Sequence, residues 1–324
     1  MNARFTPRPS GHPARLPLAA ALVMLLAAAA ACGGSAATRR PASSLQDEVR
    51  VSGELGEKPT ITIAAPMEIS TSQSWTTIKG EGDTIAPDAT AILQLTLANA
   101  RTGKTVVSTL DQGQRPLETP LGDQLFPSLR TALSGAAARS RAVVASSAAD
   151  TYGDNGAPQI GIKAGDPVVI VADVLATDPT SVADGPEGST DAVPSGAPTL
   201  VTTAGTPAGF DVTGLTKPKK AQSFVLRQGT GPAIDGPTRI AADHLGVVWG
   251  GTTPFDSSYT KEPAKFSIGI GGVIPCWDDK LDGVSAGSRV VLVCPPATAY
   301  GPTAKGSIPA RSTLVFLVDV LGVG

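Results

Sequence analysis

The sequence predicts an α+β protein built from two similar units, each an antiparallel sheet with one short helix. Three observations lead to this prediction. A long segment of the first half recurs in the second half. Several segments are dense in Val, Ile and Leu, with Gly or Pro between them. Each half also has one helix candidate that begins at a proline.

The repeat is clearest between residues 125–153 and 273–301, which align without a gap. A repeat of this length indicates a tandem duplication, so each motif should be compared with the same position in the other half. The matched positions are Pro127 and Pro275, Leu133 and Leu281, Gly135 and Gly283, Arg141 and Arg289, and Tyr152 and Tyr300.

Strands are expected where β-branched and aliphatic residues are densest. The segments are "TAILQLTL", "RAVVAS" and "VVIVADVL" in the first half, and "RIAADHLGVVW", "RVVLVC" and "LVFLVDVL" in the second. The helix candidates are residues 127–133 and 275–281, and a glycine follows each where a helix stop is expected. The helix should cover one face of the sheet in each unit.

The domain boundaries follow from composition. Residues 177–197 are rich in Pro, Gly, Ser, Thr and Asp and contain almost no large apolar side chain. Such a stretch cannot bury enough surface to offset its chain entropy, which predicts a flexible linker. The linker separates an expected domain at residues 48–176 from another at residues 198–324.

Residues 1–31 have the pattern of an export signal. Arg4, Arg8 and Arg15 precede a short apolar run that ends at Cys32. The run is too short and too rich in alanine to be read as a membrane span.

The Cys-Gly-Gly-Ser sequence that follows resembles the lipobox of a bacterial lipoprotein. This resemblance implies a lipid on Cys32, a tether at residues 32–47, and a protein anchored outside the cytoplasm, on the outer face of the bacterial cell membrane. The residue three positions before the cysteine is Ala29, where such signals usually have Leu. An ordinary secretory signal is therefore the alternative.

Composition excludes several classes of function. The formal net charge is −2 and no basic run follows the signal, so nucleic acid is not an expected partner. The two histidines are His12, which belongs to the signal, and His244. One histidine and no spare cysteine argue against a zinc site and a Ser-His hydrolase. The familiar Gly-rich phosphate loops are absent from the sequence, and we expect neither a metal nor a cofactor.

Cys276 and Cys294 remain as an even pair once Cys32 is assigned to the lipid. An oxidising compartment favours a disulfide between them. Two separate buried thiols are the alternative.

Five segments follow one another in the second half: "FDSSY" at 255–259, "KFSIG" at 265–269, "VIPCWDDKLDGV" at 273–284, "PPATAYG" at 295–301 and "SIPARSTLVFLVDVLGV" at 307–323. In this order and spacing they resemble the FKBP-type peptidyl-prolyl cis-trans isomerases. The resemblance implies a strongly twisted antiparallel sheet wrapped around a short helix, with the active cavity between them. Because of the repeat, two tandem FKBP-like domains are expected.

The resemblance also implies the site residues. Trp277 would be the floor on which the substrate's proline ring lies, and Asp256 would face the rim. The Ile274 amide and the Tyr300 hydroxyl would bond to substrate carbonyls. The remaining expected positions are the walls Phe255, Phe266 and Phe316, together with Val273 and Ile308.

The expected chemistry needs no nucleophile and no proton shuttle. Rotation about an Xaa–Pro bond loses amide resonance, against a barrier of about 18–20 kcal/mol. The twisted bond has less charge separation than the planar one, so a dry apolar pocket favours it. Composition alone would favour an ordinary aromatic core, and the spacing together with the resemblance reverses that preference. Proline-containing polypeptides are the expected substrates.

Two departures from the family pattern affect the expectations. Where the family has Tyr two residues before a glycine, this sequence has His244, with Leu245 as the other alignment. His244 would then line the cavity and donate a hydrogen bond, or else be a partly exposed strand residue. In the first half, Leu129 replaces Trp277, residues 106–108 replace Phe255 and Asp256, and Ile170 replaces Phe316. We expect a degenerate copy that folds without catalysing.

The repeat also bears on the cysteines. The first half has Ser128 and Ser146 at the positions of Cys276 and Cys294, which favours a pair gained or lost together. The preferred interpretation of the whole chain is a prolyl isomerase that assists the folding of extracytoplasmic proteins. A non-catalytic polypeptide-binding chaperone and a structural envelope lipoprotein are the alternatives.

Overall fold

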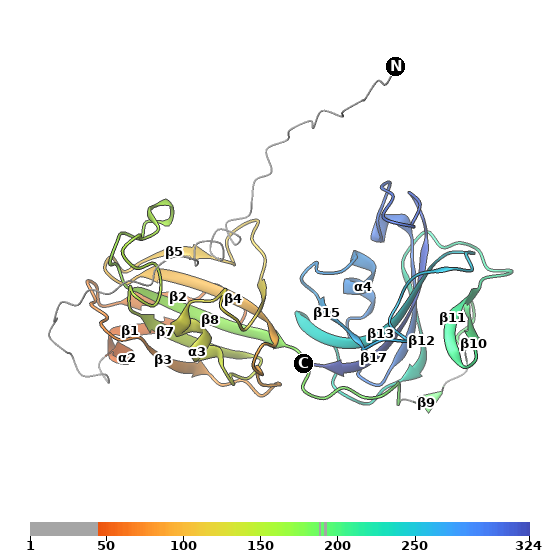
Figure 1. Ribbon diagram of the computed structural model, residues 1–324, viewed down its shortest axis with the longest axis horizontal. Coiled ribbons are helices and arrows are strands. Elements are labelled where there is room, and N and C mark those ends of the chain that lie inside the picture. The colour runs from red at the N-terminus through yellow and green to blue at the C-terminus, as the bar shows by residue number, and fades with distance from the viewer. Residues whose placement is uncertain (1–44, 188, 191–192) are drawn as a thin grey trace, which may run out of the picture.

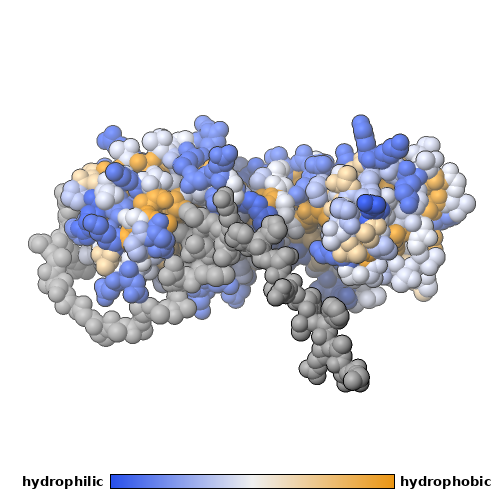
Figure 2. Space-filling view, turned by 90° about the horizontal axis from the view of Figure 1, so that it is seen from above, coloured by the Kyte–Doolittle hydropathy of each residue, from blue (hydrophilic) through white to orange (hydrophobic). Residues whose placement is uncertain are grey.

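The computed structural model describes residues 45–187, 189–190 and 193–324. The predicted signal, Cys32 and most of the predicted tether lie outside the described residues. Two lobes lie side by side, with the C-terminus between them (Figure 1). We call residues 45–177 the N-terminal unit and residues 199–324 the C-terminal unit. Hydrophilic residues cover much of both lobes when they are seen from above (Figure 2).

The N-terminal unit contains a six-stranded sheet, a separate hairpin and three short helices. Its elements are α2 (Leu45–Glu48), β1 (Val49–Ser52), β2 (Thr60–Ile63), β3 (Gln73–Ile78), β4 (Thr90–Asn99), β5 (Lys104–Ser108), β6 (Leu117–Pro120), α3 (Pro127–Leu133), β7 (Ser140–Ser146), the 3₁₀ turn η2 (Pro158–Ile160) and β8 (Val168–Thr177).

Apart from α2, the elements of the N-terminal unit recur in the same sequence in the C-terminal unit. There they are β10 (Thr199–Thr203), β11 (Thr206–Asp211), β12 (Gln222–Gln228), β13 (Thr238–Val248), β14 (Pro254–Ser257), β15 (Ala264–Ile268), α4 (Pro275–Lys280), β16 (Arg289–Cys294), the 3₁₀ turn η3 (Pro296–Thr298) and β17 (Leu314–Val323). Strand β9 (Ser189–Thr190) precedes the unit and joins its sheet.

The two sheets have the same strand order. The N-terminal order is β3-β7-β8-β4-β5 with β6 on β4, and the C-terminal order is β12-β16-β17-β13-β14 with β15 on β13. Each also has a register shift at the same place, between Ile92 and Leu93 in β4 and between Ala241 and Ala242 in β13. The pairing registers therefore assign each residue of one sheet to a counterpart in the other.

The two predicted helices are present. Helix α3 spans the predicted residues, and α4 ends one residue earlier than predicted. Gly135 and Gly283 follow them with φ of 72° and 78°, in the left-handed region that favours glycine. Each helix packs on one sheet face and closes a hydrophobic core, with Leu129 and Leu133 in the first unit and Trp277 and Leu281 in the second.

A close backbone approach explains one glycine of the repeat in each unit. A Cβ on Gly80 would lie 2.0 Å from the Ala138 carbonyl oxygen, and a Cβ on Gly229 would lie 2.1 Å from that of Ala286. Both distances are too short for any other residue. The same crossing of two chain segments is thus built into both units.

The other face of each sheet is covered by a hairpin that the sequence analysis did not predict. Hairpin β1–β2 packs on the N-terminal sheet through Val49, and β10–β11 packs on the C-terminal sheet through Phe210. Each sheet therefore lies between a helix on one face and a hairpin on the other. Leu45, in the last part of the predicted tether, is also buried here, in α2.

An Arg–Asp pair crosses neighbouring strands at the same position in both units. Arg141 bonds to Asp173 through Nε and Nη2 and also donates to the carbonyl oxygens of Gly53 and Glu54 in the β1–β2 turn. Its side chain is only 1% exposed. Arg289 makes the matching bidentate pair with Asp319. In the N-terminal unit this pair fastens the hairpin to the sheet.

The segment 177–197 differs from the predicted flexible linker. Asp178 is buried and forms ion pairs with Arg239 and Lys265 of the C-terminal unit. Thr180 bonds to Asp83, and strand β9 pairs with the edge strand β12. Composition could not reveal this because the segment is held by polar side chains and backbone groups rather than by apolar burial.

We predict that replacing Arg141 with Met destabilises the protein by about 3 kcal/mol or more, because Asp173 would keep a buried charge without its partner. Urea unfolding of the full chain measures this change. The control is Arg130→Met, which removes an ion pair between Arg130 and the almost fully exposed Asp123. That pair should contribute less than about 1 kcal/mol. Equal effects of the two substitutions would contradict the prediction.

Candidate active site

A pocket of about 210 Å³ lies between α4 and the sheet of the C-terminal unit. Strands β13, β14, β15 and β17, helix α4, the segment before α4 and the segment after η3 all contribute to the pocket. The lining residues are His244, Phe255, Asp256, Phe266, Gly272, Val273, Ile274, Trp277, Tyr300 and Phe316. Among the described residues, the structure thus brings together side chains that lie up to 72 positions apart in the sequence.

The rings are arranged edge to face around Trp277. Its ring centroid lies 4.9 Å from that of Phe266, 5.4 Å from that of Phe316 and 6.1 Å from that of His244. Phe255 in turn meets Phe316 at 5.7 Å. Edge-to-face contacts at these distances are favourable and hold each ring in one orientation. The indole is 5% exposed, so it lies at the bottom of the pocket rather than at its mouth.

Gly246 makes room for these rings. It lies on β13 opposite Phe316 on β17 and Asp256 on β14. A Cβ at this position would lie 2.6 Å from the Phe255 ring and 3.0 Å from the Phe316 ring. In the sequence this glycine served only to align His244, and its contact with the two rings was not predicted. Gly272, which lines the pocket, was also missed.

His244 points into the pocket, whereas the alternative residue, Leu245, packs against the hairpin on the opposite face. The His244 Nε2 lies 3.1 Å from Asp256 Oδ2. Because a carboxylate can only accept, Nε2 is the donor of this bond. Nδ1 is buried and has no hydrogen-bond partner among the described residues. The strand histidine and the rim carboxylate are therefore linked across the pocket wall.

Tyr300 and Ile308 complete the account of the expected positions. Tyr300 is half-buried in the pocket, with the Lys305 ammonium 4.6 Å from the centre of its ring. Ile308 is buried in the same hydrophobic core but is not among the residues that line the pocket. The expected contact of Ile308 with a bound ligand therefore stays a prediction.

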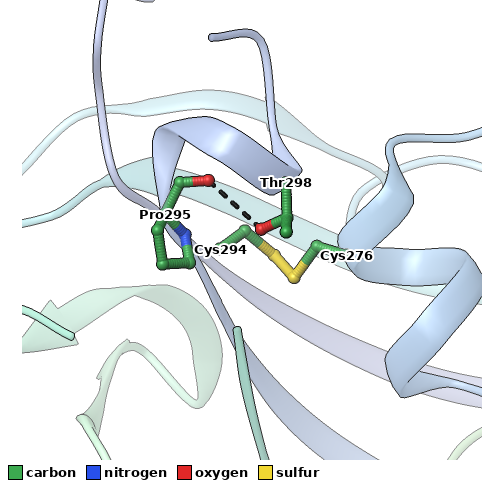
Figure 3. The surroundings of a disulfide bond; sticks show 4 residues. All are labelled: Cys276, Cys294, Pro295 and Thr298. Atoms are coloured by element: carbon green, nitrogen blue, oxygen red, sulfur yellow. Dashed lines mark hydrogen bonds between the residues drawn. A yellow bond between two sulfur atoms is a disulfide. The ribbon is translucent and has the colours of Figure 1, made fainter. Parts of the chain in front are cut away.

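The disulfide between Cys276 and Cys294 is present, as predicted. It joins the first turn of α4 to the end of β16, where the chain turns into η3 (Figure 3). The Thr298 hydroxyl donates to the Pro295 carbonyl in this turn. The bond therefore links the helix that carries Trp277 to the segment that leads to Tyr300.

The N-terminal unit has aliphatic residues at the positions of the pocket. By pairing register, Leu95 corresponds to His244, Leu97 to Gly246, and Ile170 to Phe316. Leu129 occupies the place of Trp277 on the helix. These four side chains are at most 2% exposed and belong to a single core. Leu97 places a branched side chain where the other unit leaves space.

Tyr152, the counterpart of Tyr300, belongs to the same closed core. Its ring meets Phe126 at 5.0 Å, and its hydroxyl is buried with no hydrogen-bond partner among the described residues. Burial raises the pKa of Tyr152 to about 12. The positions of the disulfide hold Ser128 and Ser146, whose hydroxyls are 2.6 Å apart beside a polar pocket of about 260 Å³.

The part of the chain that forms the aromatic pocket is similar to a known protein family. Residues 220–321 match the family described as FKBP-type peptidyl-prolyl cis-trans isomerase. The C-terminal unit belongs to this family. The match covers every residue that lines the pocket and none of the N-terminal unit.

Two curated relatives and one solved structure illustrate the similarity. The FKBP-type peptidyl-prolyl cis-trans isomerase FkpA of Escherichia coli (strain K12) is 38% identical over 100 residues, which are 31% of this chain and 36% of that protein. FK506-binding protein 2 of Debaryomyces hansenii is 42% identical over 87 residues, 26% of this chain and 64% of that protein. The crystal structure of FkpA has 36% identity and a TM-score of 0.30, covering 32% of this chain and 47% of that one.

The chain thus spans about a third of the E. coli relative and less than two thirds of the D. hansenii relative. Among the described residues, no helix is long and apolar enough to cross a membrane.

We predict that replacing both Cys276 and Cys294 with Ser, which imitates Ser128 and Ser146, destabilises the protein by about 3 kcal/mol. The half-cystines are 18 residues apart. Without the disulfide, the loop that they close has more conformational entropy in the unfolded chain, and this favours unfolding. Thermal and urea unfolding of the full chain measure the loss. The same variant should unfold alike with and without reductant, whereas a wild type insensitive to reductant would contradict the prediction.

Proposed function

We propose that the C-terminal unit catalyses the cis–trans isomerisation of peptidyl-prolyl bonds. The observation that carries the proposal is the ring-lined pocket with Trp277 at its bottom, in a unit that belongs to the FKBP-type isomerase family. A proline ring is apolar and compact, so it fits a ring-lined hollow of this size. Desolvation there favours the twisted amide over the planar one.

Seven of the ten lining residues have a proposed role in this reaction. Trp277 carries the proline ring, and Phe255, Phe266 and Phe316 exclude water around it. The Ile274 amide and the Tyr300 hydroxyl bond to the carbonyls on either side of the proline. Asp256, with its side chain 62% exposed and bonded to His244, faces the rim where the chain of the substrate enters.

The N-terminal unit is proposed to be a degenerate FKBP-like copy without isomerase activity. Its sheet has the same strand order, but Leu95, Leu97, Leu129 and Ile170 fill the space in which a proline would lie. Opening this core for a ligand is unfavourable, because exposing each of these buried side chains would cost about 1.5–3 kcal/mol.

We predict that Trp277→Leu, which imitates Leu129, lowers kcat/KM of the full chain by about 30-fold or more. Losing about 2 kcal/mol of apolar contact with the transition state accounts for this factor. A protease-coupled assay with an Xaa-Pro peptide measures it. The control is Trp75→Leu, since Trp75 packs in the N-terminal unit, away from the pocket. Residual activity near that of wild type would assign catalysis elsewhere.

The site of action is proposed from the sequence. The export signal and the lipobox at Cys32 support a protein anchored outside the cytoplasm, on the outer face of the bacterial cell membrane, where proline-containing chains fold. Replacing Cys32 with Ala should abolish the mass increase of a lipid and release the protein from the membrane fraction. An unmodified Cys32 in the mature wild-type protein would contradict the anchor.

A further inference from the structure

A cluster of charges joins the two units at Arg239 on β13. Its Nε and Nη2 donate to Asp178 Oδ1 at 2.8 and 2.6 Å, and its Nη1 donates to Glu118 Oε1 at 2.6 Å. Glu118 lies on β6 of the N-terminal unit. Asp178 Oδ2 also accepts from Lys265 Nζ at 3.0 Å and from the Thr90 amide at 3.3 Å. Strands of both units therefore converge on one guanidinium.

The two central charges of the cluster are buried, whereas Glu118 is 39% exposed and Lys265 is 47% exposed. The side chain of Arg239 is 6% exposed and that of Asp178 is 10% exposed. Burial by itself would raise the pKa of Asp178, but the hydrogen bonds from Arg239 and Lys265 outweigh it, and the pKa lies below its usual value. Removing one member of such a pair would leave the other charge buried without its partner, which is strongly destabilising. The side-chain position of Arg239 is therefore set by acidic residues that lie outside the C-terminal unit.

Strand β15 connects this cluster to the pocket. Side chains alternate between the two faces of a strand, so Lys265 and Ser267 face one side and Phe266 faces the other. Lys265 bonds to Asp178, and Ser267 accepts from Arg239 at 2.9 Å, whereas Phe266 forms a wall of the pocket. In Figure 1, β15 lies on the side of the C-terminal unit that faces the N-terminal unit.

The loop after β15 is held from both sides. From within its own unit, Asp278 accepts hydrogen bonds from the Gly269 and Gly271 amides at 2.8 and 3.1 Å. From the N-terminal unit, Arg115 donates to the Gly271 carbonyl at 3.4 Å. The place of a Cβ on Gly272 lies 3.8 Å from Glu118 Oε2. Gly272 itself lines the pocket, so residues of the N-terminal unit lie directly behind the pocket wall.

We propose that the N-terminal unit positions one wall of the prolyl pocket. Glu118 is the positioning residue: it binds Arg239 of β13, and through Arg239 it holds strand β15 and the loop at residues 269–273 in place. The inference rests on the proposed isomerase function of the C-terminal unit. The N-terminal unit, proposed to be non-catalytic, would then contribute to the reaction by positioning the pocket wall. A wall held in place before the substrate arrives need not be ordered during binding, which lowers the entropy cost of association.

The test uses the full chain with Glu118→Gln, which removes the charge and keeps the shape. The matched control is Glu68→Gln, because Glu68 bonds to an arginine at 2.6 Å as Glu118 does, but to Arg101 of its own unit and at an exposed site away from the interface. Two quantities are compared with wild type: amide hydrogen exchange of residues 264–273, and KM and kcat for an Xaa-Pro peptide.

Glu118→Gln should speed the exchange of this segment several-fold and raise KM about threefold with kcat unchanged, since the lost ordering affects ground state and transition state alike. Asp178→Asn, at a buried site, should act in the same direction and more strongly. Glu68→Gln should change neither quantity. Rescue by Glu118→Asp would further distinguish a charge contact from simple loss of packing.

Two results would overturn the proposal. One is a Glu118→Gln chain that matches Glu68→Gln in both exchange and KM. The other is faster exchange with an unchanged KM, because the wall would then be held by the N-terminal unit without affecting the pocket. A wild type that binds no proline peptide and shows no turnover would refute the isomerase function instead, and the exchange of residues 264–273 would still report whether Glu118 holds the wall.

Discussion

The pocket of the C-terminal unit depends on one packing constraint, the absence of a side chain at Gly246. The Phe255 and Phe316 rings meet where its Cβ would be, and Trp277 packs against Phe316 in turn. With the rings held edge to face, the indole lies at the bottom of the pocket. In the other unit Leu97 takes the place of this glycine and, together with Leu95, Leu129 and Ile170, belongs to a filled core.

What the two units share is the frame that holds the site, rather than the site itself. The strand order, the shifted register, the buried Arg–Asp pair and the close crossing at Gly80 and Gly229 all recur. These features fix the backbone geometry of either unit, whatever the pocket contains. The residues at the ring positions do not set the strand order, and they differ between the units. The two units therefore combine one frame with different side chains beneath the helix.

The charges at the boundary between the units have a different consequence. Arg239 lies on β13 of the C-terminal unit, Glu118 lies on β6 of the N-terminal unit, and Asp178 follows the last strand of the N-terminal unit, so their ion pairs cross the boundary. Burial makes their pairing strongly dependent on the relative position of the two units, because Coulomb attraction at low dielectric falls steeply when the partners separate and water enters. The segment between the units is therefore part of the interface, even though its composition is that of a loop.

The sequence by itself determined the local elements and most of the residues that line the pocket. The density of Val, Ile and Leu predicted the long strands, and proline placement predicted α3 and α4, because these elements depend on neighbours along the chain. The resemblance to the family predicted that Phe255, Phe266, Trp277 and Phe316 lie together. Tertiary structure alone decided the rest: the hairpins β1–β2 and β10–β11, the choice of His244 over Leu245, the space at Gly246 and the role of Asp178. Each of these depends on which surfaces pack against one another in the fold. A single sequence gives the residues on those surfaces, but it does not show which of them come into contact.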